Sequence, residues 1–163
     1  YLVCESIHSE AKRAVEDAIG DIIAAIKVGS IVAGAGATEI EVSKQLRLFA
    51  NSLSGREQLA VMAYADAIEV IPITLAENAG LDPIDVLTEL KSAHDKDDNE
   101  AGINVFSGKI INAWKEGIIE PLKIKTQAIS SASEVAVMIL RIDDIIAGQP
   151  EQGQQPPPHA NLQ

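Results

Sequence analysis

The chain turns at Gly29-Ser-Ile-Val-Ala-Gly-Ala-Gly-Ala-Thr-Glu-Ile-Glu41, where one helical pattern ends and another begins. The first pattern ends at Gly29, glycines return at positions 34 and 36, and a second helix is predicted to begin at Thr38. Glycine lets a backbone approach a ligand closely, and the helix N-terminus behind it offers unpaired N–H groups. Two interpretations follow: an anion-binding loop, or a plain tight turn between helices, since the stretch matches neither Gly-x-Gly-x-x-Gly nor a Walker loop.

Composition limits the class of protein. The 163 residues suffice for one domain with a sizeable core, which must be built of Ala, Ile, Leu and Val because only 3% of residues are aromatic. A net charge of −11 argues against a nucleic-acid-binding surface and against an anionic membrane. No apolar run reaches the roughly 18 residues of a membrane span. The single cysteine, Cys4, excludes an internal disulfide and is typical of a reducing, cytoplasmic compartment.

Apolar periodicity, caps and breakers predict five helices, so the fold class is mainly α. Capping-box patterns, Thr38-x-x-Glu41 and Ser54-x-x-Glu57, are expected to start the second and third helices, and Pro72 is expected to kink the third. Asp82-Pro83 is expected to start the fourth helix. The predicted ranges are about 9–28, 38–54, 54–78, 84–94 and 122–136.

Short extended segments are predicted between the last two helices. Residues 103–112 resemble a small β-hairpin with its turn at Ser107-Gly108, and Gly117 to Pro121 is a second extended piece. Residues 137–146 either continue the fifth helix or form a terminal strand. From residue 148 the chain is rich in Gln and Pro, which predicts a disordered tail. The start at Tyr1-Leu-Val-Cys4 is strand-like and lacks an initiator Met, so we expect a piece of a longer chain.

No metal site is predicted. The acidic stretch 95–100 lacks the spacing of an EF-hand and is interpreted as a solvated loop that follows His94. The three histidines are scattered without a Cys partner or an HExxH motif.

Several motifs nevertheless follow one another in a defined order. They are Val15-Glu-Asp-Ala18, Ile31-Val-Ala-Gly-Ala-Gly-Ala-Thr-Glu39, Ser54-Gly-Arg-Glu-Gln-Leu-Ala60, Leu75-Ala-Glu-Asn-Ala-Gly-Leu-Asp82, Ala101-Gly-Ile-Asn-Val-Phe-Ser-Gly108, Ile119-Glu-Pro-Leu-Lys-Ile-Lys-Thr-Gln-Ala128 and Leu140-Arg-Ile-Asp-Asp144. As a set they resemble the C-terminal half of a group II chaperonin subunit, the thermosome class.

The resemblance implies a multihelical half of a chaperonin equatorial domain. Residues 1–28 would be the descending helix of the intermediate domain, 29–147 the C-terminal part of the equatorial ATPase domain, and 148–163 the tail. The parent protein would use ATP and Mg²⁺ to cycle a double ring of like or unlike subunits that encloses unfolded polypeptide. The alternative is a non-catalytic assembly module, or a truncated relative, that keeps only the packing helices. A helical scaffold with an accidental glycine turn is a third interpretation.

The resemblance also implies roles for single residues. Asp17 would position magnesium and the attacking water. Gly34, Ala35 and Gly36 match a triple-glycine turn at the ribose, although Ala35 departs from the pattern and its methyl group requires a negative φ. The remaining nucleotide-binding residues would be Gly102, Asn104 and Val105 on the hairpin, of which the last two match an adenine-contacting pair, Ile118 against the base, and Glu120 accepting the ribose hydroxyls.

The family's phosphate-binding Gly-Asp-Gly-Thr loop, its metal-binding aspartate and its apical domain have no counterpart in these residues. We therefore expect half an ATP site, little or no ATP hydrolysis by this chain alone, and apolar helix faces that expect partners from elsewhere.

Overall fold

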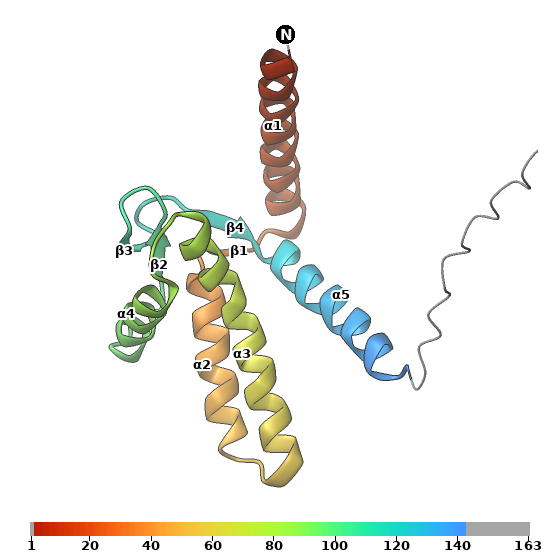
Figure 1. Ribbon diagram of the computed structural model, residues 1–163, viewed down its shortest axis with the longest axis vertical. Coiled ribbons are helices and arrows are strands. Elements are labelled where there is room, and N and C mark those ends of the chain that lie inside the picture. Colours follow the sequence, from red (N-terminus) through yellow and green to blue (C-terminus); the bar gives the residue numbers. More distant parts are fainter. Residues whose placement is uncertain (1, 143–163) are drawn as a thin grey trace, which may run out of the picture. The chain divides into compact units, whose positions relative to one another are not determined.

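The computed structural model describes residues 2–142, with side chains from residue 7 onward. The chain divides into two units, residues 1–128 and 129–163, and the fold that carries the candidate site lies in the first. Figure 1 labels its elements in chain order, which are α1 (Leu2–Val28), β1 (Ile31–Ala33), α2 (Ala37–Ala50), α3 (Gly55–Asn78), α4 (Pro83–Asp95), β2 (Ala101–Asn104), β3 (Lys109–Asn112), β4 (Ile119–Pro121) and the beginning of α5 (Leu122–Leu140). The mainly α prediction is confirmed.

The first helix is longer than its apolar pattern predicted. It begins at Leu2 instead of near Ser9, so the strand-like interpretation of the first residues is wrong. Residues 2–8 contain neither glycine nor proline, and nothing in them stops a helix that extends toward the N-terminus.

Helix α2 starts differently from the prediction. Its N-cap is Gly36, in the left-handed conformation with φ 80°, and no side chain caps it. Thr38, the expected cap, instead donates its hydroxyl proton to the Ala33 carbonyl oxygen at 2.6 Å. The hydroxyl thus ties the first turn of α2 to β1, and the capping-box prediction is wrong here.

The other two predicted starts are correct in position. Ser54 is the N-cap of α3, but its side chain makes no capping hydrogen bond, so the second capping box is also wrong. Asp82 does cap α4, because its Oδ1 accepts from the backbone N–H of Ile84 at 2.8 Å and of Asp85 at 3.3 Å. Pro83 follows at the first helical position, where its missing N–H costs nothing.

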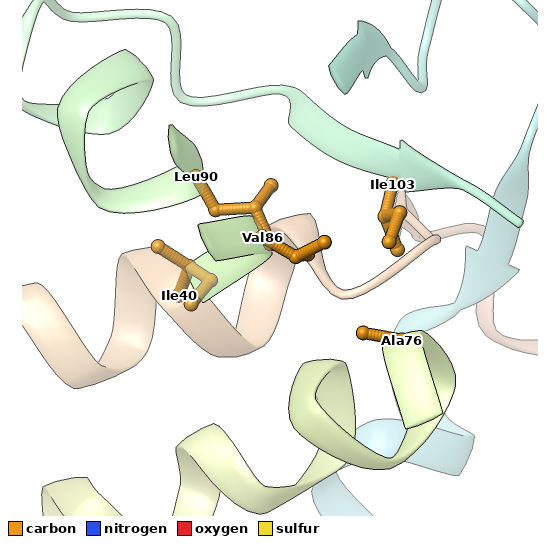
Figure 2. Packing of buried hydrophobic residues seen from close by; sticks show 5 residues of the cluster. All are labelled: Ile40, Ala76, Val86, Leu90 and Ile103. Atoms are coloured by element: carbon orange, nitrogen blue, oxygen red, sulfur yellow. The ribbon is translucent and has the colours of Figure 1, made fainter. Parts of the chain in front are cut away.

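The core joins α2, α3, α4 and β2. Ile40, Leu90 and Ile103 are almost completely inaccessible to solvent, and Ala76 and Val86 complete their cluster. Figure 2 shows these five side chains converging from four different elements. Within residues 7–142, whose side chains are described, no aromatic side chain is buried, and the core consists of the aliphatic residues that the composition predicted.

By its length of 24 residues and the mean hydropathy of 1.7 over an 18-residue window, helix α3 could cross a membrane, contrary to the sequence prediction. Its buried residues include Glu69, whose carboxylate binds Arg47 of α2 at 2.9 Å and Lys91 of α4 at 2.8 Å. Pro72 is also buried within it. A carboxylate with two cationic partners on neighbouring helices belongs to a packed core, so we interpret α3 as the central helix of this unit.

Two small antiparallel sheets complete the unit. The predicted hairpin is confirmed as β2 and β3, which pair Gly102 with Ile111. The predicted extended piece is β4, which pairs with β1 so that Glu120 lies opposite Val32. β1 was not predicted, since its three residues read as an interhelical turn. The alternatives for 137–146 are partly resolved, because α5 continues to Leu140, whereas residues 143–146 and the predicted tail lie outside the described residues.

Candidate functional site

The glycine turn lies against the end of β4. The backbone N–H of Gly34 donates to the Ile118 carbonyl oxygen at 2.9 Å. A Cβ placed on Gly34 would lie 2.9 Å from Glu120 Oε1 and 3.2 Å from Ile118 Cγ2. A side chain at position 34 would thus displace Glu120, and glycine lets Glu120 and Ile118 pack directly against the backbone of the turn. Both residues, named from the resemblance, therefore reach Gly34.

 The conformation of Ala35 corrects one expectation. Ala35 adopts a φ of 56°, in the left-handed region, where a negative value was required for its methyl group. This conformation costs a residue with a side chain roughly 1–2 kcal/mol. The methyl group fits because Gly102 stands opposite: a Cβ on Gly102 would lie only 2.8 Å from Ala35 Cβ. The Ala35 carbonyl oxygen also accepts the N–H of Ile103 at 2.9 Å, which fastens the turn to β2.

Gly36 closes the turn on its other side. It has φ 80°, and a Cβ there would lie 2.9 Å from Pro72 Cβ in α3. The turn is therefore held between β4, β2 and α3, and the glycines at 34, 36 and 102 each avoid a steric clash.

The hairpin residues Asn104 and Val105 follow directly after the contact of Ile103 with the turn. Asn104 Oδ1 accepts from the backbone N–H of Phe106 at 2.9 Å and of Ser107 at 3.1 Å, so its side chain organises the hairpin turn. Val105 lies in that turn and not in a strand, because β2 ends at Asn104. An adenine contact by these two residues stays a prediction.

Two ion pairs that share Lys125 lie beside the glycine turn. Glu39, in the first turn of α2, is 3% exposed, and its Oε1 lies 2.5 Å from Lys125 Nζ. The same Nζ lies 2.8 Å from Glu120 Oε2. Burial opposes the charged form of Lys125, but the hydrogen bonds that its ammonium group donates to Glu120 and Glu39 outweigh burial and raise the lysine pKa. One ammonium group therefore joins α5, α2 and β4.

Comparison with known proteins identifies the family. The family model described as the TCP-1/cpn60 chaperonin family matches residues 3–150. The chain belongs to this chaperonin family. The prediction from the ordered motifs is thereby confirmed.

Relatives and a solved structure agree with this chaperonin membership. The chain is 56% identical over 152 residues to a thermosome subunit of Methanocaldococcus jannaschii, covering 93% of this chain and 28% of that protein. It is 59% identical over 145 residues to a thermosome subunit beta of Archaeoglobus fulgidus, covering 89% and 27%. The open-state monomer of a group II chaperonin from Methanococcoides burtonii superposes with a TM-score of 0.68 at 55% identity, covering 70% of this chain and 28% of that one. The chain thus spans little more than a quarter of the length of these chaperonins.

Asp17, the predicted catalytic residue of this chaperonin chain, is not brought to the turn. Its carboxylate is exposed, and its ion-pair partner is Arg13 on the same helix, at 3.8 Å. It lies eleven residues before the end of α1, which is about 16 Å along the helix axis. Asp21, one turn closer, lines a small cavity together with Glu120.

The described residues differ in how well they fit a nucleoside and a magnesium ion, the two ligands that the resemblance implies. Gly34 is bordered by a carboxylate and an apolar side chain, the residue types expected beside a ribose and a base. For magnesium, no group of three or more His, Cys, Asp or Glu side chains that could hold a metal ion occurs among the described residues. The residue types around Gly34 therefore agree with a nucleoside, whereas the described residues include no cluster that fits the metal.

Sequence reasoning missed Glu39, Lys125 and His94. His94 was placed at the boundary between the fourth helix and a polar loop, but it is fully buried in the last turn of α4. Its Nδ1 lies 3.0 Å from Glu41 Oε2, and its Nε2 lies 2.9 Å from the Ala101 carbonyl oxygen. The available signal was its position at the end of a periodic helix, on the same face as the buried Leu90.

Proposed function

We propose that this chain forms the nucleoside-binding half of the ATP site of a chaperonin subunit. The parent protein would be an ATP-dependent chaperonin that assists folding in a cytoplasmic double ring. Residues 29–147 would belong to its equatorial domain and residues 1–28 to its intermediate domain. The observation that carries the proposal is the contact of Gly34 with Ile118 and Glu120, which lie more than 80 residues later in the chain.

The chemistry expected of these residues is recognition and not bond cleavage. The Glu120 carboxylate would accept hydrogen bonds from ribose hydroxyls, which are strong because the acceptor is charged. Ile118 and the hairpin backbone from Gly102 to Val105 would border the adenine. ATP, bound with a magnesium ion, would supply the phosphoanhydride bond whose hydrolysis drives the ring cycle. In this chain only Asp17 would take part in that step, by orienting the attacking water.

Substitutions of Asp17 and of Glu120 should have different effects on ATP turnover and on ADP binding. In the protein at its full natural length, Asp17→Asn should reduce ATP turnover while leaving the Kd for ADP unchanged. Glu120→Gln should weaken ADP binding by about tenfold, because it replaces a charged acceptor with a neutral one. Unchanged ADP binding by Glu120→Gln would overturn the proposal. The 163-residue chain alone should turn over ATP much more slowly than the full subunit, and equal rates would contradict the half-site.

A second candidate is a non-catalytic assembly module. It is favoured by the apolar side chains that α1 leaves exposed, such as Ile22 at 60% and Ile26 at 77%. Calorimetry with a non-hydrolysable ATP analogue separates the candidates, because a module without a nucleotide site should give no binding heat.

A further inference from the structure

The two carboxylate oxygens of Glu120 have different neighbours. Its Oε1 faces the glycine turn, at 2.9 Å from the position that a Cβ on Gly34 would take. Its Oε2 lies 2.8 Å from Lys125 Nζ. The lysine therefore binds the oxygen that points away from the turn and sets the direction of the other one.

Lys125 is itself held in place by a buried anion. The Glu39 carboxylate, 3% exposed, lies 2.5 Å from Lys125 Nζ, and its second oxygen, Oε2, has no hydrogen-bond partner among the described residues. Glu39 lies in the first turn of α2, where the helix dipole favours a carboxylate. Lys125 side-chain exposure is only 14%, so water competes weakly for its ammonium group.

The three groups also connect the elements that carry the proposed nucleoside contacts. Glu39 belongs to the helix that begins directly after Gly36, Glu120 belongs to the strand paired with β1, and Lys125 lies in the first turn of α5. A shift of the glycine turn relative to β4 would change both ion pairs together. An ordinary surface lysine, free to rotate, would not fix this geometry.

We propose that Lys125, anchored by Glu39, is a positioning residue that aims the Glu120 carboxylate at the ribose hydroxyls and so makes the site prefer ribonucleotides with both hydroxyls. The inference rests on the proposed function, because it requires a ribose beside Glu120. It assigns a role to two residues that touch no part of the nucleotide. It also explains why a buried carboxylate stands where the glycine turn becomes a helix.

The test compares two ligands that differ only in the hydroxyls. Calorimetry on the assembled protein at its full natural length measures the Kd of ADP and of 2′,3′-dideoxy-ADP. The wild type should prefer ADP by about tenfold, the effect of a hydrogen bond to a charged group. Lys125→Met should bring the two affinities to within about twofold of each other, mainly by weakening ADP binding. Lys125→Arg should restore most of the preference, since the guanidinium can bridge two carboxylates.

Controls keep the outcome interpretable. Lys123→Met removes an exposed lysine two residues earlier and should keep the wild-type preference. Lys125→Met leaves Glu39 buried without its cation and can unfold the protein. The double variant Glu39→Gln with Lys125→Met removes both charges and should also lose the preference while folded.

The results distinguish a failure of the proposed ribose contact from a failure of the proposed role of Lys125. A wild-type protein that binds both ligands equally would overturn the ribose contact and, with it, the inference. A wild type that prefers ADP, together with a folded Lys125→Met or double variant that keeps this preference, would overturn the inference alone.

Discussion

Helices α1 and α2 look alike in sequence but differ in what they contact. Both carry apolar residues at three- and four-residue intervals. Helix α2 buries Ala37, Ile40 and Ala50, together with the polar Glu39 and Ser43. None of the described side chains of α1 is buried, and its isoleucines stay exposed. An amphipathic pattern thus identifies a helix and its apolar face, but whether that face is covered depends on residues elsewhere in the chain or in a partner.

The largest expected effect lies in the core that covers α2. Leu90→Ala removes a side chain with no exposed surface and leaves a cavity beside Ile40. It should lower the free energy of unfolding by about 3 kcal/mol. Urea denaturation of the 163-residue chain measures this, and a loss below about 1 kcal/mol would show that the α2 core is not packed as described.

The next largest effect is expected at His94, whose contact with Glu41 connects α4 to α2. His94→Leu removes the side-chain contacts to the Ala101 carbonyl oxygen and to Glu41 Oε2, so that Glu41 keeps only the hydrogen bond from Gln45. Burial opposes the charge on Glu41, but the hydrogen bonds from His94 and Gln45 lower its pKa. The substitution should cost about 2 kcal/mol of unfolding free energy and raise the Glu41 pKa. Thermal unfolding and carboxyl NMR titration check the two results, and an unchanged Glu41 pKa would show that the histidine does not hold it.

A smaller, pH-dependent effect is expected at Glu69. Burial raises its pKa, but hydrogen bonds from Lys91, Ser43 and Arg47 outweigh this and lower the pKa below the usual 4.5. Such a group contributes stability that is fully present above the unfolded-state pKa and is lost as the pH falls through the lower folded-state pKa.

Glu69→Gln should therefore cost about 1 kcal/mol at pH 7, and its difference from the wild type should shrink below about pH 4. Denaturation at a series of pH values measures this difference. A constant difference from pH 7 to pH 3 would be the contrary finding.

The smallest effect on stability is expected for a substitution in α1. Ile22→Gln on α1 replaces a side chain that is 60% exposed, so the free energy of unfolding should change by less than about 0.5 kcal/mol. Self-association of the chain should decrease, because an apolar stripe loses part of its surface. Sedimentation velocity and urea denaturation test both parts. A loss like that of Leu90→Ala would mean that α1 is covered in the folded chain.

Much of the fold follows from local pattern. Periodicity located all five helices, the Asp82-Pro83 cap fixed the start of α4, and alternation predicted the β2–β3 hairpin. These features depend on residues within one turn or one hairpin of each other. The strand β1 was missed because its three residues acquire a partner only at β4, almost 90 residues later.

The site shows the same limit. The family motifs correctly predicted that Gly34 and Glu120 would meet, but the polar residues around them depend on long-range contacts. Thr38 bonds to the Ala33 carbonyl instead of capping a helix, and Lys125 meets Glu39 across 86 positions. The left-handed conformation of Ala35 is possible only because Gly102 leaves room for its methyl group. No short window of sequence contains this information.

The central claim is that the glycine turn and the hairpin border one nucleoside site. Photolabelling the protein at its full natural length with 8-azido-ATP, followed by peptide mapping, tests it most directly, because the reactive group sits on the base. The account predicts label on peptides that contain residues 102–105 or 118–120, suppressed by excess ADP. Recovery of both peptides unlabelled, with ADP-sensitive label elsewhere in this chain, would contradict it.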